Sequence, residues 1–288
     1  MREIEDLLGP ALDCDLHHYT GIAGLHGIAT SRSIWASSAY YLNDSSEIME
    51  AVRFTSHVAC QMAQSADEGA AVVLDHLQEW LKTLQRPQGI YVLSLSSKEN
   101  DLSQWRAYTP YTKGVCLSFS SDQILSLARS NGCKVVKCIY SEKEKTRLAK
   151  LIVEKTLQTW RSTCEDDIPK AHPSQKYHPL FESMKSNYLA LFVLFKDQRF
   201  SSEGEWRIVS PYIASYVEER VDYRVGASIM IPFIKIGLPS DGPLFDRVWI
   251  GPTEHNNLSM HAISAFLSKY RLVRSGCISS GIPYREWR

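Results

Sequence analysis

Two glutamates that stand one residue apart, Glu203 and Glu205, lie in the stretch Glu-Gly-Glu-Trp-Arg and are well placed to do chemistry. On a β-strand, residues i and i+2 point to the same face, so the two carboxylates would sit side by side. Their mutual repulsion would raise the pKa of one of them. One carboxylate could then act as a base or hydrogen-bond acceptor while the other stabilises developing positive charge. The alternative is a solvated strand edge with Arg207 nearby.

A second group of polar residues ends an expected strand over residues 16–20. His18, Tyr19 and Thr20 stand directly before Gly21, which breaks the strand ahead of a helical pattern. A histidine ring and two hydroxyl groups in this place could contact ribose or phosphate oxygens. A buried core histidine is the competing interpretation of the same segment.

A third polar cluster closes an aromatic-rich, extended segment and contains Tyr40, Tyr41, Asn43 and Asp44. Tyr41 and Asn43 are candidate binding residues in this cluster. An Asn-Asp pair ahead of a helical pattern is usually a helix cap, however. Asp44 or Ser45 would make a good N-cap for a helix that begins near residue 46.

Two further candidate groups lie on an expected strand over residues 90–96 and in the segment that follows it. Ser94 and Ser96 share one face of that strand and could line a cleft beside a sugar. Trp105, Arg106 and Tyr108 then offer a planar cation between two aromatic rings, which suits stacking against a base or binding a phosphate. A packed tryptophan with a surface arginine is equally consistent with these residues.

The sequence lacks metal-ligand spacing and the common catalytic motifs. His172 and His178, like Cys133 and Cys138, are not spaced as zinc ligands are, so we expect no metal site. There is no G-x-S-x-G turn, no P-loop and no G-x-G-x-x-G. These features disfavour ordinary hydrolases, NTPases and Rossmann dehydrogenases.

The hydrophobic pattern predicts strands near both ends of the chain with helical segments between them. Helical periodicity covers about residues 46–85 and about residues 141–196. We therefore expect an α+β fold in a single domain, 1–288, with a single mixed or antiparallel sheet core. The two helical segments would be insertions into that fold.

Charge and cysteine content narrow the class of protein. The 288 residues carry 32 basic and 32 acidic side chains, so no net field attracts the molecule to nucleic acid or anionic lipid. The 7 cysteines show no C-x-x-C spacing, which favours reduced thiols. The first residues lack the apolar region of a signal peptide, and no apolar run is long enough to span a membrane. We expect a cytoplasmic protein without a membrane partner.

Several separate motifs occur in the order found in the bacterial domain-of-unknown-function family twenty-nine seventy-one, which the chain resembles. The motifs that carry the resemblance are His18–Thr20, Ser33–Ala36, Leu42–Glu47, Val92–Ser96, Leu102–Tyr108, Glu203–Arg207, Ile231–Ile234, Ile250–Thr253 and Ile282–Arg285. That family has no agreed activity, so the resemblance leaves the function open.

A second resemblance is to the ADP-ribosyltransferases. These proteins carry a His or Arg on an early strand, a Ser or Tyr on a middle strand, and a Glu, often in E-x-E, on a late strand. His18, then Ser94 or Ser96 (alternatively Tyr41), then Glu205 occur here in that order. The opening strand followed by a helix is also similar and implies the split sheet of that fold. The middle motif departs from the family's Ser-Thr-Ser, and no short loop identifies the turn that would bind an acceptor.

This second resemblance implies roles for the candidate side chains. NAD would be the substrate, and no metal would be needed. Glu205 would bind the 2′-hydroxyl of the nicotinamide ribose and stabilise an oxocarbenium-like transition state, while Glu203 would face the acceptor nucleophile. His18 and the serine would hold NAD. By analogy, such a protein could act as a toxin or in phage defence, on a protein or nucleic-acid acceptor.

Two other classes of function stay open at this point. A non-catalytic nucleotide-binding or sensor module would use the same cleft without turnover. A metal-dependent nuclease or phosphodiesterase would use Asp44, Glu47, Glu203 and Glu205, and it would require a divalent ion. The neutral net charge slightly disfavours a nucleic-acid substrate.

Overall fold

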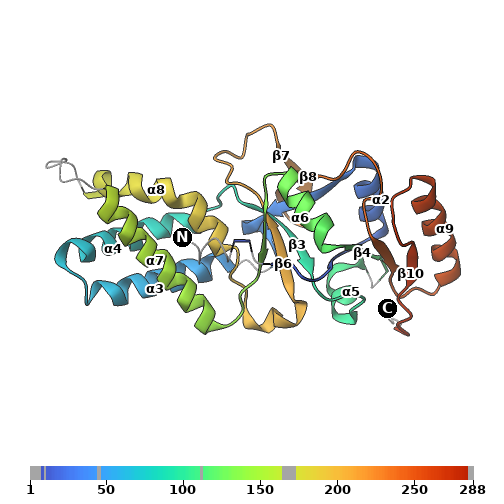
Figure 1. Cartoon of the computed structure of the whole chain (residues 1–288), viewed down its shortest axis with the longest axis horizontal. Helices are drawn as coiled ribbons and strands as arrows, with labels where there is room; N and C mark the ends of the chain where they lie inside the picture. The colour runs from blue at the N-terminus through green and yellow to red at the C-terminus, as the bar shows by residue number, and fades with distance from the viewer. Residues whose placement is uncertain (1–7, 10, 44–46, 111–112, 164–172, 285–288) are drawn as a thin grey trace.

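The computed structural model describes residues 8–9, 11–43, 47–110, 113–163 and 173–284 of the chain. These residues form an α+β fold with one mixed, mostly antiparallel sheet, so the expected fold class is confirmed (Figure 1). The strands are β1 (Leu16–Thr20), β2 (Ser33–Ser38), β3 (Tyr91–Ser96), β4 (Val115–Phe119), β5 (Lys134–Lys137), β6 (Glu205–Val209), β7 (Val221–Val225), β8 (Met230–Gly237), β9 (Arg247–Ile250) and β10 (Cys277–Ser279).

Helices cover both faces of this sheet and extend beyond one end of it (Figure 1). The α-helices are α2 (Ile22–Ser31), α3 (Glu47–Ala63), α4 (Glu68–Leu81), α5 (Leu102–Tyr108), α6 (Ser121–Ser130), α7 (Glu142–Thr163), α8 (Pro173–Phe192) and α9 (Asn256–Lys269). Short 3₁₀ helices are η1 (Ala39–Tyr41), η2 (Lys82–Gln85) and η4 (Gln198–Glu203).

Strand β3 has three neighbouring strands, and this arrangement splits the sheet. Along one edge, β6 pairs with β3 from Val92 to Ser96. Two strands share the opposite edge of β3: β1 pairs with β3 only at Ser96, and β2 pairs with β3 only at Tyr91 and Val92. Within the described residues, the stretch 93–95 therefore has no strand partner on that edge.

The direction of the strands explains the split. Both β1 and β2 are antiparallel to β3, so they run parallel to each other beside the same edge. Parallel neighbours need a crossover connection, and α2 supplies it between β1 and β2. Beyond the split, β1 continues through β4 and β9 to β10, whereas β2 continues through β8 to β7. The sheet thus has two wings that meet at β3.

Two hydrophobic cores lie on opposite faces of the sheet. Val92, Val136 and Val209 pack with the buried side chains of α3, α4, α7 and α8. Leu93 and Leu95 point to the other face, as the alternation of a strand requires, and pack with α2, α6 and α9. The helices α3, α4, α7 and α8 form one block at an end of the molecule (Figure 1). We call them the helical block.

The helical block comes from the two segments that the sequence predicts to be helical. Segment 46–85 contains α3, α4 and η2, and segment 141–196 contains α7 and α8. In α4 the buried side chains include Val73, Leu74 and Leu77, which follow helical spacing. The block therefore buries its own apolar faces, in a core that is continuous with the sheet.

No helix among the described residues has both the length and the apolar character needed to cross a membrane. The described cysteines are all free thiols, and two of them, Cys116 and Cys138, are buried. Cys164 lies outside the described residues.

Leu77 is fully buried in the core of the helical block, so we expect Leu77→Ala to lower the free energy of unfolding by about 2–5 kcal/mol. Val72 is 39% exposed on the same helix, and Val72→Ala should change it by less than about 1 kcal/mol. Urea unfolding of both variants at neutral pH measures the difference. Equal losses would contradict the packing of α4.

Candidate functional site

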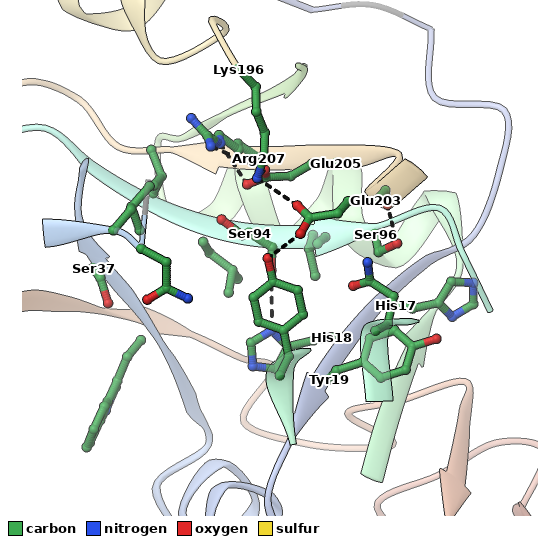
Figure 2. Close-up of a pocket in the computed structure, with 18 of the residues that line it drawn as sticks. His17, His18, Tyr19, Ser37, Ser94, Ser96, Lys196, Glu203, Glu205 and Arg207 are labelled. Carbon is green, nitrogen blue, oxygen red and sulfur yellow. Dashed lines mark hydrogen bonds and ion pairs between the residues drawn. The ribbon is translucent and has the colours of Figure 1, made fainter. Parts of the chain in front are cut away.

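A cavity of about 230 Å³ opens where β1 and β2 part from β3. Figure 2 shows how side chains from both wings and from β6 lie around it. The residues proposed from the sequence that line it are His18, Tyr19, Tyr41, Asn43, Glu47, Ser94, Ser96, Tyr108, Glu203, Glu205 and Arg207. Thr20, Trp105 and Arg106 are not among the lining residues.

The two glutamates do not share a strand, so the prediction of i and i+2 neighbours on one strand face is wrong. Glu203 ends the 3₁₀ helix η4, and Glu205 begins β6. Between them Gly204 takes a left-handed conformation with φ +54°, and a Cβ there would collide with Ser97 Oγ. This turn nevertheless brings both carboxylates to one cation, Lys196 (Figure 2).

Five charged side chains form a buried network at the wall of the cavity. Arg207 donates from Nε to Glu205 Oε1 at 2.8 Å and from Nη2 to Glu47 Oε1 at 2.7 Å. Lys196 binds Glu205 and, at 2.7 Å, Glu203. Arg207 Nη1 also donates to the carbonyl oxygen of Val193. With three carboxylates against two cations, the ionised network carries one net negative charge.

The surroundings of Glu205 keep its carboxylate ionised. Burial alone would raise its pKa, but the Arg207 guanidinium and the Lys196 ammonium lower that pKa to about 2. The expectation that repulsion raises a pKa does not hold for Glu205. At Glu47, burial outweighs Arg207 and raises the pKa. Glu205 is therefore a fixed anion at neutral pH, better suited to stabilising positive charge than to carrying protons.

His18 contributes a neutral imidazole from the other side of the split. Its Nδ1 lies 3.3 Å from the carbonyl oxygen of Ser94, which can only accept a hydrogen bond. Nδ1 therefore donates, and Nε2 is left as an acceptor. Burial lowers the pKa of His18, so the ring is uncharged at neutral pH. Such a ring can accept a hydrogen bond from a sugar hydroxyl.

His17 also lines the cavity, but its contacts fit the competing interpretation of a core histidine. It is buried, and its Nδ1 lies 2.9 Å from Ser118 Oγ on the neighbouring strand β4. Its side chain is therefore held within the β1–β4 wing.

Two of the expected polar residues hold Glu203 in place. Ser96 Oγ donates to the backbone oxygen of Glu203 at 2.6 Å and accepts from the backbone nitrogen of Lys98. The Tyr108 hydroxyl donates to Glu203 Oε1 at 2.7 Å. Ser94 Oγ, by contrast, has no hydrogen-bond partner within the described part of the chain. Ser94 is thus free to bind a ligand, whereas Ser96 is engaged.

The predicted stack of Arg106 between Trp105 and Tyr108 is wrong. All three lie on helix α5, where Trp105 is fully buried edge-on against Tyr19, with ring centroids 4.9 Å apart. The Arg106 guanidinium instead lies over the ring of Tyr284. The alternative of a packed tryptophan with a surface arginine therefore describes this segment.

The other residues of the expected polar clusters have mixed positions. The Tyr19 hydroxyl donates to the carbonyl oxygen of Lys98 and accepts from the backbone of Asp101, so it fixes the loop after β3. Tyr41 and Asn43 reach the cavity from η1 and the residues that follow it. The cap residues expected at Asp44 and Ser45 lie outside the described residues.

Sequence reasoning missed several cavity residues. Lys196 follows the buried run Leu191–Phe195, and a lysine directly after so apolar a run is the one signal that could have marked it. Trp35, Ser37 and Arg224 line the cavity from the β2–β8–β7 wing. Nothing local distinguishes them, because their place depends on strand pairing.

The residues named for a metal-dependent enzyme do not suit a divalent ion. Lys196 and Arg207 already pair with Glu47, Glu203 and Glu205, and a metal would have to displace these cations. The described residues contain no group of three or more His, Cys, Asp or Glu side chains that could hold a metal. Asp44 and His172 lie outside the described residues.

A protein-family model described as "Protein of unknown function (DUF2971)" matches residues 104–208. This span runs from α5 to the end of β6, so it includes Tyr108, Lys196, Glu203, Glu205 and Arg207 but not β1, β2 or β3. The first resemblance is confirmed over that span, and it brings no activity with it. Comparison with curated proteins and with solved structures found no match, so the likeness to ADP-ribosyltransferases has no support there.

Because its partners lower the pKa of Glu205 from an ordinary value of 4.5, this carboxylate stabilises the fold above about pH 4.5. That contribution is lost as the pH falls toward 2. We expect Glu205→Gln to reduce the free energy of unfolding by about 3–5 kcal/mol at pH 7 and by nearly as much at pH 5, with a smaller deficit below about pH 4.5.

Urea unfolding at pH 7, 5, 4 and 3 measures this deficit. Exposed Glu254 provides the matched control, and Glu254→Gln should stay within about 0.5 kcal/mol of the wild type throughout. A deficit that is constant with pH would mean that Glu205 is not held ionised.

Proposed function

We propose that the protein binds NAD in the split of the sheet and breaks its glycosidic bond, as an ADP-ribosyltransferase-like enzyme does. One observation carries this proposal: His18 on β1 and Glu205 on β6 line a single cavity at the unpaired edge of β3. The order of these residues along the chain and the split sheet are the two features that the resemblance implies. The acceptor would be a protein, a nucleic acid or water.

The proposed reaction is a substitution at C1′ of the nicotinamide ribose. The bond from C1′ to the nicotinamide nitrogen breaks, and its electron pair neutralises the positive charge of the ring. An acceptor nucleophile then forms the new bond to C1′ and loses its proton. Positive charge develops on the ribose between these events, so an anion fixed nearby would lower the barrier.

Glu205 supports this role through its charge rather than through proton transfer. Its low pKa keeps it ionised, and Arg207 and Lys196 orient it before any ligand binds. The excess negative charge of the network also favours a cationic nicotinamide ring over a neutral one. A preorganised carboxylate of this kind stabilises a transition state without reorganising.

The other lining groups support binding and the approach of the acceptor. His18 Nε2 and Ser94 Oγ offer polar atoms to ribose hydroxyls on one side of the cavity. Glu203 is the most exposed member of the charged network, with 14% of its side chain accessible. It is bound to Tyr108, whose pKa burial and Glu203 raise, so the tyrosine stays protonated. We assign to Glu203 the orientation of the acceptor nucleophile.

The size of the cavity supports enclosure of only part of the dinucleotide. Its volume of about 230 Å³ lies below the roughly 300–1,000 Å³ of sites that enclose a drug-sized ligand. The nicotinamide ribose would therefore occupy the inner cavity beside Glu205. The rest of NAD would extend toward the β2–β8–β7 wing.

A second candidate function is nucleotide binding without turnover. It is favoured by the pairing of Glu205, both of whose carboxylate oxygens already bind Arg207, while Lys196 also binds one of them. A carboxylate whose two oxygens are already bound has fewer lone pairs left to accept a hydrogen bond from a ribose hydroxyl. Binding of NAD without release of nicotinamide would select this candidate.

We expect the purified protein, incubated with NAD in the absence of divalent metal, to release nicotinamide. Glu205→Gln should reduce that release at least about 100-fold, because it removes the fixed charge and retains the shape. Chromatography of nicotinamide measures the release, and label transfer from NAD identifies an acceptor. Glu254→Gln is the matched control and should retain full activity.

Thermal melting and NAD binding of each variant show whether Glu205→Gln is still folded and able to bind. No release by a wild-type protein that binds NAD would overturn the proposed chemistry and leave a binding module. Absence of both release and NAD binding would overturn the proposed function and would leave binding of a different nucleotide as the second candidate.

Glu203→Gln should separate binding from transfer. We expect the variant to bind NAD within about threefold of the wild type, because a glutamine at this position could still accept a hydrogen bond from Tyr108. Transfer to the acceptor should fall at least about tenfold, because the charge that orients the nucleophile is removed. Parallel binding and transfer assays measure the two effects, and a loss of binding equal to the loss of transfer would contradict the assigned role.

A further inference from the structure

The outer part of the cavity carries an aromatic surface that the proposed chemistry leaves unused. Trp35 of β2 is 48% exposed, and its indole stacks on Phe233 of β8 with ring centroids 4.3 Å apart and planes inclined by 29°. Phe233 is buried, so it supports the indole from one side. A half-exposed tryptophan in a cavity wall offers a flat apolar surface to a planar ligand.

A cationic side chain lies on the same face of this wing. Ser37 of β2 is paired with Phe233 of β8, so these two side chains point to the same face of the sheet. The register between β7 and β8 places Arg224 on that face as well. Arg224 Nη2 donates to Ser37 Oγ at 3.4 Å, a long contact. Both Ser37 and Arg224 line the cavity beside Trp35.

Arg224 has no carboxylate partner within the described residues. Asp222, which shares its face of β7, pairs with Lys235 at 3.2 Å. The Arg224 guanidinium therefore keeps most of its donors available to an anion, and it can present two of them in parallel to a phosphate.

These groups stand apart from the charged network along β3. Glu205 is paired with Ser96, whereas Ser37 is paired with Val92, four residues away and thus about 13 Å along the strand. A ligand that reaches both places must be elongated. It must also place a planar ring near Trp35, an anion near Arg224 and a positive centre near Glu205.

We propose that Trp35 and Arg224 form a subsite for a purine nucleotide. The base stacks on the exposed face of Trp35, and the phosphate accepts hydrogen bonds from Arg224. This inference rests on the proposed function for the identity of the whole ligand, since the nucleotide is then the adenylate half of NAD. The nicotinamide ribose lies at the other end, beside Glu205.

The test compares ligands that differ only by the base or the phosphate, with the full chain and isothermal calorimetry. The wild type should bind adenosine 5′-phosphate at least about tenfold more tightly than ribose 5-phosphate, because only the former carries the stacking base. Trp35→Ala should abolish this preference, and Trp35→Phe should retain part of it. Tyr270→Ala, which removes an exposed aromatic ring outside the cavity, should leave the preference unchanged.

The phosphate contact is tested in the same way. The wild type should bind adenosine 5′-phosphate more tightly than adenosine, and Arg224→Gln should reduce that preference at least about fivefold. The Arg224→Gln variant should keep the wild-type preference for adenosine 5′-phosphate over ribose 5-phosphate. A preference for the phosphate that survives Arg224→Gln would overturn the role of this arginine.

The result that overturns the base subsite is equal binding of adenosine 5′-phosphate and ribose 5-phosphate by the wild type, or undiminished preference in Trp35→Ala. Failure of the wild type to bind adenosine 5′-phosphate overturns it as well. None of these ligands contains nicotinamide, so the outcome is independent of NAD cleavage. Intact base preference without nicotinamide release would overturn the proposed function alone.

Discussion

Arg207 brings a positive charge into the interior of the molecule, where it is tolerated only if its donors are paired. Glu205 pairs with it from the same strand, and Glu47 pairs with it from the start of α3. The carbonyl oxygen of Val193 accepts from it just after α8. One guanidinium thus joins the sheet to both segments of the helical block, and its need for anions accounts for two of the carboxylates at the cavity wall.

The same pairing sets the limits of what the cavity can do. Arg207 and Lys196 keep Glu205 ionised and still, which suits a group that acts by its field and does not suit one that must move protons. Glu203 stands at the edge of the network and keeps more contact with the cavity. Glu203 and Glu205 look equivalent in the sequence, but they differ in how deeply each side chain is buried in the charged network. The neutral charge of the whole chain conceals this local excess of negative charge.

The parts of the fold that follow from local periodicity could be predicted, as the helical segments and the alternating strand around Ser94 illustrate. The site was predicted only in part. Glu203 was misplaced because Gly204 takes a left-handed turn that an E-x-E motif does not reveal. Lys196 and Trp35 were missed because their neighbours in space come from strand pairing and helix packing. Trp105 was wrongly predicted to stack against a ligand. The sequence pattern of an aromatic residue beside an arginine is the same whether the ring packs in a core or lines a binding site.

The contacts of Arg207 with α3, β6 and the residue after α8 determine how these elements can separate in local opening. Separating α3 from β6 would leave a buried guanidinium facing fewer anions, a state that lies several kcal/mol above the closed one. The amide groups at the start of α3, in β6 and after α8 should therefore exchange their hydrogens through one shared opening rather than through three independent ones. We therefore expect the helical block and the split sheet to open together around Arg207, as one cooperative unit.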